Sequence, residues 1–579
     1  MPRMLQLVHA CLRLLLLVLL VAPPASAQSA SYEFDVIIRG GRVVDGTGRP
    51  AFVGDVAIKG DRIARVGRLP RGAKARRVVE ARGLVVAPGF IDLLGQSEIN
   101  VLIDPRAMSK VMMGVTTEVT GEGGSVAPMN ERLIEEDRDF YNRYNVDVDW
   151  RTLGEYFARL ERRPPGVNVA TFVGATQVRS YVVGFENRAP TREELERMRR
   201  LVADAMEDGA LGLSTSLQYV PARFATTDEL VELAKVAARY GGIYATHQRS
   251  EANALDASLS EVFDIARRAR IPAEIWHLKA AYRKNWGRMP EVLARIRAAR
   301  ARGLDVSADV YPYTAASTSL NACLPPWALE GGVEKMLARL RDPAARERIK
   351  QEMVMDSNDW ENIYLGSGGA RGVLVGAVIN RELEGLQGKR ISQIAKEQGK
   401  DGPTAVLDLI LADRGQTSAI YFMMSEDDLR AAVREPFVSF CTDSSARATD
   451  GPLAGSKSHP RGWGSYARVL SRYVRDEKLL TLEQAIRKMT GLPARRVGLR
   501  DRGVLRAGMF ADITVFDPAR VRDLATFEEP NRYAEGIEYV LVNGQLEVDG
   551  GRRTEVNAGR PLRGPGYRPN TSTKPLKGM

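Results

Sequence analysis

The chain alternates short apolar segments with helical segments along most of its 579 residues, and this alternation limits the folds open to it. Helices are clear at 192–208, 227–240 and 290–302, where apolar residues recur every three or four positions and a glycine follows the last turn. Eight candidate strands lie beside such helices: 89–94, 116–120, 169–173, 211–216, 243–247, 273–277, 305–311 and 437–443. This pattern predicts an α/β protein with a (β/α)8 TIM-type barrel. A doubly wound open sheet is the alternative, but no glycine-rich phosphate loop follows any of the strands.

The two ends of the chain differ from the middle in their pattern of apolar and polar residues. Residues 32–87 alternate apolar and polar positions between Gly-Gly and Gly-Asp turns, which indicates short antiparallel strands. Similar strands return at 511–517 and 539–544. We therefore expect 32–87 and 497–563 to join into one small β-sandwich.

The barrel would then occupy residues 88–496. Its stretch of about 320–436, before the eighth strand, is longer than a normal connection and is expected to be an insertion over the barrel mouth. Residues 564–579 are rich in Pro, Gly, Lys and Thr, and we expect them to form a disordered tail.

The start of the chain has the pattern of a secretory leader. Arg3 and Arg13 precede an apolar run at 14–22, and a small-residue cleavage site follows at 25–27. The run is shorter than the roughly 20 residues that span a bilayer. The sequence therefore predicts a signal peptide over 1–27 and export from a bacterial cytoplasm, to the periplasm or the medium, with no stable membrane anchor after cleavage. An uncleaved anchor is the alternative.

Charge and cysteine content exclude some classes of protein. The formal net charge is +11, but the basic residues are scattered, and no nucleic-acid-binding module or aromatic platform accompanies them. We therefore expect no nucleic-acid partner. Only Cys323 and Cys441 remain after leader cleavage, which excludes a disulfide framework and leaves at most one bridge. The oligomeric state stays open.

Histidine is nearly absent from the chain, which makes the positions of the four histidines informative. His247 closes the apolar run Gly-Ile-Tyr-Ala-Thr-His, and His277 closes Ala-Glu-Ile-Trp-His. Two imidazoles at the ends of successive strands, with Asp443 ending a later strand, favour a metal site at the mouth of a parallel barrel. A pair of buried, hydrogen-bonded histidines is the alternative.

Several stretches carry a resemblance to a known family: Val-Val-Ala-Pro-Gly-Phe-Ile-Asp (85–92), Gly-Ala-Leu-Gly-Leu-Ser-Thr (209–215), Tyr-Ala-Thr-His-Gln-Arg-Ser-Glu (244–251), Tyr-Pro-Tyr-Thr-Ala (311–315) and His-Pro-Arg-Gly-Trp-Gly (459–464). With its order of sandwich, barrel and sandwich, the chain resembles the amidohydrolase superfamily and, within it, the D-aminoacylase (N-acyl-D-amino-acid deacylase) family. The resemblance covers essentially the whole mature chain. It implies a metal-dependent hydrolase of the amide bond in small N-acyl amino acids, expected to be of D configuration. A dipeptide or cyclic-amide hydrolase on the same scaffold is the alternative.

The resemblance also implies roles for individual residues. His247 and His277 would be metal ligands, and Asp443 would accept a proton from the attacking water and return it to the departing amine. Asp443 could instead only cap the turn Asp-Ser-Ser. Five further residues would hold the substrate's carboxylate and acyl oxygen: Tyr219, Lys279, Tyr311, Ser317 and Arg461.

The chain departs from the family pattern in two places. The superfamily's first strand normally ends in His-x-His, where this chain has Leu94 and Gln96, so a two-metal site of the usual kind is not expected. The family's cysteine ligand lies in a Gly-Asn-Cys-Gly turn, where this chain has Gly-Glu-Gly-Gly at 121–124. Because a carboxylate binds zinc at a distance similar to an imidazole, we expect one divalent metal, zinc, held by Glu122, His247 and His277. The alternative is that Glu122 makes only a turn hydrogen bond and the protein binds ligand without turnover.

Overall fold

Parallel strands form the centre of the protein, as the alternating pattern predicts. The computed structural model describes residues 32–357 and 359–569, so the predicted leader lies outside the described residues. The barrel strands are β6 (Phe90–Asp92), β7 (Val115–Thr120), β8 (Asn168–Thr171) with β9 (Val173–Gly174), β10 (Gly212–Ser216), β11 (Ile243–His247), β12 (Ala273–Ile275), β13 (Val306–Val310) and β17 (Val438–Phe440). Strands β6, β7 and β8 pair in parallel in that order. A second parallel series runs β9, β10, β11, β12, β13 and β17. All eight predicted strands are confirmed.

The barrel closes where its first strand meets its eighth. Gly95 and Ser444 form a parallel bridge, and the Asp443 N–H donates to Leu94 O at 2.7 Å. A Cβ on Gly95 would lie 1.8 Å from the Glu118 carboxylate, so only glycine fits this approach. The end of β6 is therefore a direct neighbour of the end of β17.

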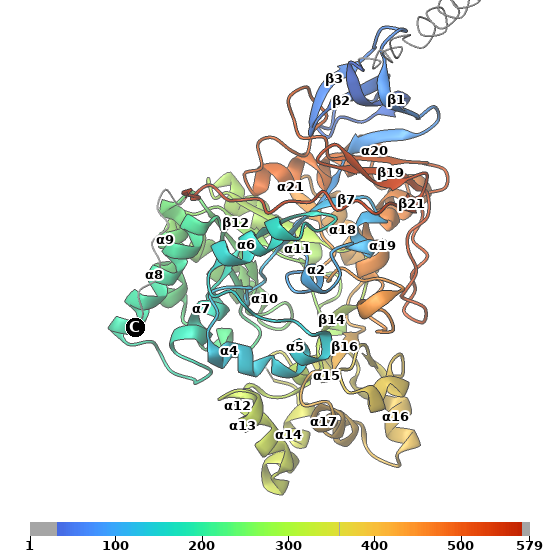
Figure 1. Ribbon diagram of the computed structural model, residues 1–579. Helices are drawn as coiled ribbons and strands as arrows, with labels where there is room; N and C mark the ends of the chain where they lie inside the picture. The colour runs from blue at the N-terminus through green and yellow to red at the C-terminus, as the bar shows by residue number, and fades with distance from the viewer. Residues whose placement is uncertain (1–31, 358, 570–579) are drawn as a thin grey trace, which may run out of the picture.

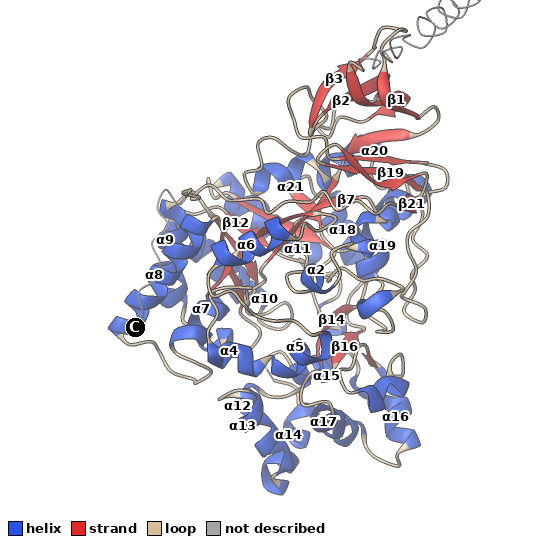
Figure 2. Cartoon of the chain, in the orientation of Figure 1, coloured by secondary structure: helices blue, strands red, loops and turns tan. Residues whose placement is uncertain are grey.

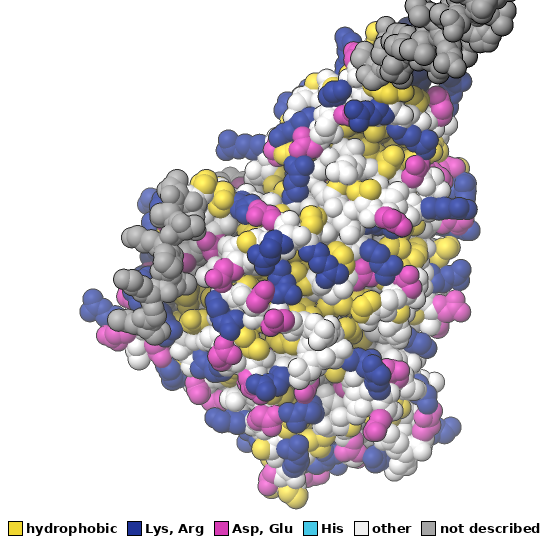
Figure 3. Space-filling model, in the orientation of Figure 1, with side chains coloured by type: hydrophobic (Ala, Val, Ile, Leu, Met, Phe, Trp, Pro, Cys, Tyr) yellow, Lys and Arg dark blue, Asp and Glu magenta, His cyan; other side chains and the backbone are white. Residues whose placement is uncertain are grey.

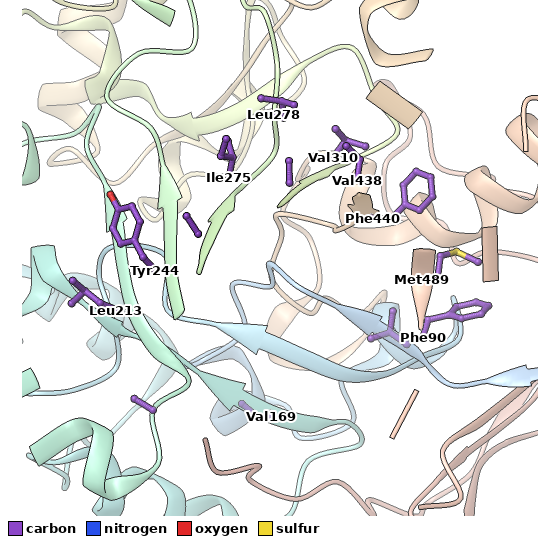
Figure 4. Packing of buried hydrophobic residues seen from close by; sticks show 14 of the residues in the cluster. Phe90, Val169, Leu213, Tyr244, Ile275, Leu278, Val310, Val438, Phe440 and Met489 are labelled. Atoms are coloured by element: carbon purple, nitrogen blue, oxygen red, sulfur yellow. The ribbon is translucent and has the colours of Figure 1, made fainter. Parts of the chain in front are cut away.

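Helices cover the outside of the barrel (Figure 2), and the face of the molecule seen in Figure 3 mixes Lys and Arg with Asp and Glu side chains. The principal ones are α8 (Arg192–Asp208), α9 (Thr227–Arg239), α10 (Leu255–Ala269), α11 (Met289–Ala301) and α18 (Glu426–Arg434). Thr191 and Glu194 form a capping box that starts α8, as expected for Thr followed three residues later by Glu. Side chains of successive strands, among them Leu213, Ile275 and Phe440, share one apolar cluster with these helices (Figure 4).

The remaining helices of the barrel region are short. They are α2 (Asn100–Ile103), α3 (Met108–Val111), α4 (Glu131–Glu136), α5 (Arg138–Tyr144), α6 (Leu153–Arg162), α7 (Ala175–Val182), α19 (Arg461–Arg468), α20 (Leu482–Met489) and α21 (Gly491–Arg496). No helix in 32–357 or 359–569 is long and apolar enough to cross a membrane.

Both ends of the chain contribute to one nine-stranded sheet, which lies on one side of the barrel (Figure 1). Its strands are β1 (Phe34–Val43), β2 (Phe52–Lys59), β3 (Arg62–Gly67), β4 (Ala75–Glu80), β5 (Val85–Pro88), β18 (Ile513–Phe516), β19 (Ile537–Val542), β20 (Gln545–Asp549) and β21 (Arg552–Arg553). The two ends meet where β5 pairs antiparallel with β18. The two ends of the chain, predicted to join into a small β-sandwich, thus meet in one sheet.

The segment that packs against the barrel extends further toward the C-terminus than predicted. The Gly564 N–H donates to Gly209 O at 2.8 Å, and the Arg568 N–H donates to Glu207 O at 2.9 Å. Residues 564–568 therefore lie against the end of α8 and are not a disordered tail, because backbone hydrogen bonds to that helix end compensate for their polar composition. Residues 570–579 lie outside the described residues.

An insertion separates β13 from β17 and lies opposite the nine-stranded sheet (Figure 1). Its three antiparallel strands are β14 (Ala316–Ser319), β15 (Val373–Val375) and β16 (Ser418–Tyr421). Its helices are α12 (Pro326–Leu329), α13 (Val333–Arg341), α14 (Pro343–Met353), α15 (Ile363–Gly366), α16 (Ile391–Glu397) and α17 (Gly402–Ala412). The predicted bounds of the insertion, about 320–436, included α18. In the structure α18 packs against α11 and is part of the barrel wall.

Candidate active site

One cavity of about 250 Å³ at the carboxyl ends of the barrel strands gathers all nine predicted site residues. They are Glu122, Tyr219, His247, His277, Lys279, Tyr311, Ser317, Asp443 and Arg461. They come from separate strand ends and from the insertion, which supplies Ser317 on β14. Parallel strands all end at the same face of a barrel, so residues far apart in sequence converge there.

Three of these residues form a compact group of metal-ligand type. Glu122 Oε1 lies 3.0 Å from His247 Nδ1 and 3.1 Å from His277 Nε2. All three ligand atoms lie within 4.8 Å of one another. Ligand atoms in a tetrahedral zinc site are roughly 3.3 Å apart for bonds of about 2.0–2.1 Å. The group therefore fits a divalent metal ion, and its nitrogen and carboxylate donors suit zinc.

Each histidine has a partner on its other ring nitrogen. His247 Nε2 lies 2.8 Å from Gln218 Oε1, and His277 Nδ1 lies 2.9 Å from Glu251 Oε1. Both partners can accept from the ring, although the Lys279 ammonium also lies 2.8 Å from His277 Nδ1. In each ring the opposite nitrogen faces Glu122 and can offer its lone pair to a metal ion once it has lost its proton. These contacts fix the ring orientations that metal binding requires.

Replacing Gln218 with alanine is expected to weaken metal binding by about 10- to 100-fold, because His247 loses the acceptor that orients its ring. Competition with a metal-binding dye measures this affinity without any substrate. Gln393→Ala, on the exposed face of α16, removes an amide far from the site and should leave the affinity unchanged. Equal affinities for Gln218→Ala and the unaltered protein would contradict the orienting role.

The charges around the group favour a bound cation. Burial and Lys279 lower the pKa of His277, but Glu251, Asp443 and Glu122 together raise it to about 10. Burial alone would raise the pKa of Glu122, but His247 and His277 hold it well below its usual range. Ionised carboxylates thus stabilise positive charge here, and a divalent ion can supply that charge in place of protons.

Two of the site residues have backbone conformations that are rare for residues other than glycine. His277 has φ +36° and Asp443 has φ +49°. The Asp309 carboxylate holds the first by accepting from the His277 N–H at 2.6 Å, and Leu94 O holds the second. Such conformations persist only when surrounding contacts fix them, and they cluster at functional sites.

Asp443 pairs with a buried guanidinium. Arg461 Nη1 lies 2.7 Å from Asp443 Oδ2, and the guanidinium lies over the Tyr311 ring at 4.6 Å from its centroid. Burial raises the pKa of Asp443 above its ordinary value, and Arg461 counteracts part of that effect. Arg461 Nε and Nη1 are both buried without a hydrogen-bond partner among the described residues, but Nη1 forms the ion pair with Asp443, so the Nε–H is the group left for a ligand.

Three predicted substrate-binding residues line the cavity in ways the sequence did not indicate. The Lys279 ammonium is paired with Glu251 Oε1 at 2.6 Å. The Tyr311 hydroxyl lies 3.5 Å from Met424 Sδ and presents its ring to Arg461 instead. Ser317 contacts Arg461 through its backbone carbonyl at 3.1 Å. Their roles toward a substrate stay predictions.

Sequence reasoning missed three residues that shape the site, Gln218, Glu251 and Asp309, and noted Gln96 only as the residue in place of a histidine. Glu251 lies four residues after His247, inside the stretch that carries the family resemblance, and that position was its only signal. Asp309 is a carboxylate within the apolar strand β13, an unusual place for an acid that could have marked it.

Comparison with known proteins agrees with this geometry. A model of the amidohydrolase family matches residues 443–547. The chain is 37% identical over 541 residues to the D-aminoacylase of Alcaligenes xylosoxydans xylosoxydans, which covers 93% of this chain and 99% of the relative. The chain belongs to the D-aminoacylase family of amidohydrolases.

Two solved structures of this D-aminoacylase family are similar over nearly the whole chain. One is a D-aminoacylase described as having a binuclear metal centre with one-metal activation and second-metal attenuation; it is 35% identical, covers 92% of this chain and 100% of its own, and has a TM-score of 0.75. The other is the N-acyl-D-glutamate deacylase of Bordetella bronchiseptica with zinc and a phosphonate inhibitor; it is 32% identical, covers 92% and 99%, and has a TM-score of 0.77. The family resemblance and fold class are confirmed.

Proposed function

We propose that this protein hydrolyses the amide bond of N-acyl amino acids with one divalent metal ion, zinc, and releases a carboxylate and a free amino acid of D configuration. The observation that carries the proposal is the convergence of Glu122, His247 and His277 with Asp443 and Arg461 in one cavity. The names of the relatives, D-aminoacylase and N-acyl-D-glutamate deacylase, support the choice of substrate.

The residues divide the reaction between them. A metal ion held by Glu122, His247 and His277 would supply Lewis-acid activation of the attacking water and of the acyl carbonyl. Asp443 accepts the proton that the attacking water gives up and returns it to the departing nitrogen, so that the amine leaves neutral. Arg461 offers its free Nε–H to the substrate's carboxylate and, through Nη1, holds Asp443 in place.

The site has room for an acyl group beyond the metal ligands. A second cavity, of about 790 Å³, shares Gln96, Glu122, Gln218, Tyr219 and Thr318 with the first. It extends toward the insertion and has a mixed polar and apolar lining. With the carboxylate at Arg461 and the scissile carbonyl at the metal ligands, the acyl group would occupy this second cavity.

Its lining also favours a second candidate function. The described residues around this cavity include no lysine or arginine but do include Glu98, Glu136, Asp137 and Glu361, in a chain with formal net charge +11. Burial raises the pKa of all four carboxyls, to about 7 for Glu98 and about 6 for Asp137, so a positive group beside them would stabilise their ionised forms. A dipeptide, whose acyl part carries a free ammonium, is therefore the alternative substrate.

A single purified sample tests both candidates. Metal content by elemental analysis is measured together with rates on N-acetyl-D-amino acids, N-acetyl-L-amino acids and dipeptides. Faster hydrolysis of the N-acetyl-D compounds supports the first proposal, and faster hydrolysis of dipeptides supports the second. A metal-loaded protein that hydrolyses none of them contradicts both.

Arg461→Lys is expected to lower kcat/KM by about 10- to 100-fold on substrates that carry a free carboxylate, because one lysine ammonium cannot pair with Asp443 and also supply the separate N–H donor that the carboxylate would use. The corresponding substrate amides, which lack that carboxylate, should lose much less. Arg192→Lys, at the exposed start of α8, is the matched control. An equal loss on both substrate types would show that Arg461 acts only through Asp443.

We further propose that the protein is exported, on the basis of the leader pattern at 1–27. Fractionation of cells that express the full chain should place a shortened protein outside the cytoplasm. A full-length protein in the cytoplasm would contradict export.

A further inference from the structure

Gln96 lies in the segment after β6, where the first barrel strand meets the last, β17. The Gly95 N–H donates to Val119 O at 2.7 Å, and the Gln96 N–H donates to Ser444 O at 3.3 Å. The next residue, Ser97, donates its hydroxyl to Glu118 Oε1 at 2.6 Å. Hydrogen bonds to both neighbouring strand ends thus fix the backbone from which the Gln96 side chain extends.

The side-chain amide of Gln96 lies between two carboxylates of the site. Its Nε2 donates to Glu122 Oε2 and lies 3.3 Å from Asp443 Oδ1. Glu122 uses its other oxygen, Oε1, toward the two histidines. An amide nitrogen carries two N–H donors, so one neutral group can serve both carboxylates.

We propose that Gln96 closes the position that a second metal ion would otherwise take, limits the centre to one ion, and positions Asp443 beside it. The metal centre itself is part of the proposed function, so the inference rests on it. Metal stoichiometry is measured without any substrate, however, so the two can fail separately.

A second ion could bind here only at a high cost. It would need Glu122 Oε2 and Asp443 Oδ1 as ligands, and the N–H groups of Gln96 direct partial positive charge at both oxygens. The other place where the family has a histidine is Leu94, which is fully buried in an apolar cluster and offers no donor atom. Zinc needs nitrogen, oxygen or sulfur lone pairs; Leu94 has none, and the Gln96 nitrogen that faces the two carboxylates donates its hydrogens and has no lone pair to share.

Metal exclusion is tested by elemental analysis after incubation with a tenfold excess of Zn²⁺ or Co²⁺ and removal of free metal. The unaltered protein is expected to hold one equivalent per chain. The double variant Leu94→His with Gln96→His should hold two, and with Co²⁺ the two ions should give the magnetic coupling of a close pair. Gln96→Glu replaces donors by acceptors at nearly the same volume, and should also admit a second ion if the double variant fails to fold.

The positioning role is tested by Gln96→Ala. It is expected to lower kcat by about 10- to 100-fold with KM changed less than about threefold, because Asp443 loses its orientation and the substrate contacts remain. Gln393→Ala on α16 removes an amide far from the site and should leave stoichiometry and kcat unchanged.

Three results would overturn the inference. The first is an unaltered protein that takes up two equivalents. The second is a folded double variant and a folded Gln96→Glu variant that both stay at one. The third is Gln96→Ala with the kcat of the unaltered protein, which would remove the positioning role and leave Gln96 without a part in catalysis.

Discussion

Asp443→Asn is expected to lower kcat by about 10²- to 10⁴-fold while the metal stays bound, which is the range that a positioned acid or base contributes. Asparagine has nearly the same shape and can still contact Arg461, but its amide cannot accept a proton from water at neutral pH. Glu122, His247 and His277 remain intact in this variant, so its loss is one of proton transfer. Steady-state kinetics and elemental analysis on the same sample measure both quantities.

Asp549→Asn is the matched control for this substitution. Asp549 lies on β20 in the nine-stranded sheet, where it pairs with Arg77 at the surface, and its variant should keep full activity. If Asp443→Asn retained near-normal turnover with one equivalent of metal, another residue would have to carry the proton, and the proposed division of roles would be wrong.

Lys110→Met is expected to destabilise the fold by about 3–5 kcal/mol, which is the usual cost of removing one partner from a buried ionic group. Lys110 is fully buried beneath the site, 2.7 Å from Asp92 and 3.3 Å from Glu118, and it also donates to Ser444 O at 2.7 Å. Burial alone would lower the pKa of Lys110, but the two carboxylates raise it above its ordinary value. Methionine fills similar space and leaves both acids buried without their cation.

The midpoint of urea denaturation of metal-free protein measures this effect, since metal binding would otherwise add its own stabilisation. Lys235→Met is the control, because Lys235 pairs with Glu232 at the surface of α9, where such pairs contribute less than about 1 kcal/mol. If Lys110→Met shifted the urea midpoint as little as Lys235→Met does, the three buried groups would not depend on one another.

The sequence predicted the barrel because its strands are buried on both faces. Strands such as β11, which is buried at every position, appear as short continuous apolar runs, and the helices between them show a clear three-to-four-residue period. The pairing of the two chain ends was predictable, since 32–87 and the segments after 511 share the alternation of apolar and polar residues that is typical of antiparallel strands. The packing of the tail after 564 was not predictable, because it depends on residues distant in sequence: backbone hydrogen bonds to Glu207 and Gly209, an ion pair between Arg568 and Glu207, and the close approach of Gly564 to Ala210.

The site was predictable wherever a residue type is rare and its position is marked by a strand end. His247 and His277 meet both conditions, and Glu122 was found because it stands where the family has a cysteine. Gln218 and Glu251 were missed because glutamine and glutamate are common in loops, and only their distance to a histidine ring gives them a role.

By itself, the sequence determined the strand and helix order, the family, and the set of side chains able to bind a metal, because these follow from local periodicity and from residue chemistry. Only the tertiary structure decided which of those side chains meet. Gln96 and Asp443 are 347 positions apart, yet they lie within hydrogen-bond distance because the barrel closes between β6 and β17. Such contacts depend on how the whole barrel closes, and no local pattern in the chain encodes the distance between two strand ends.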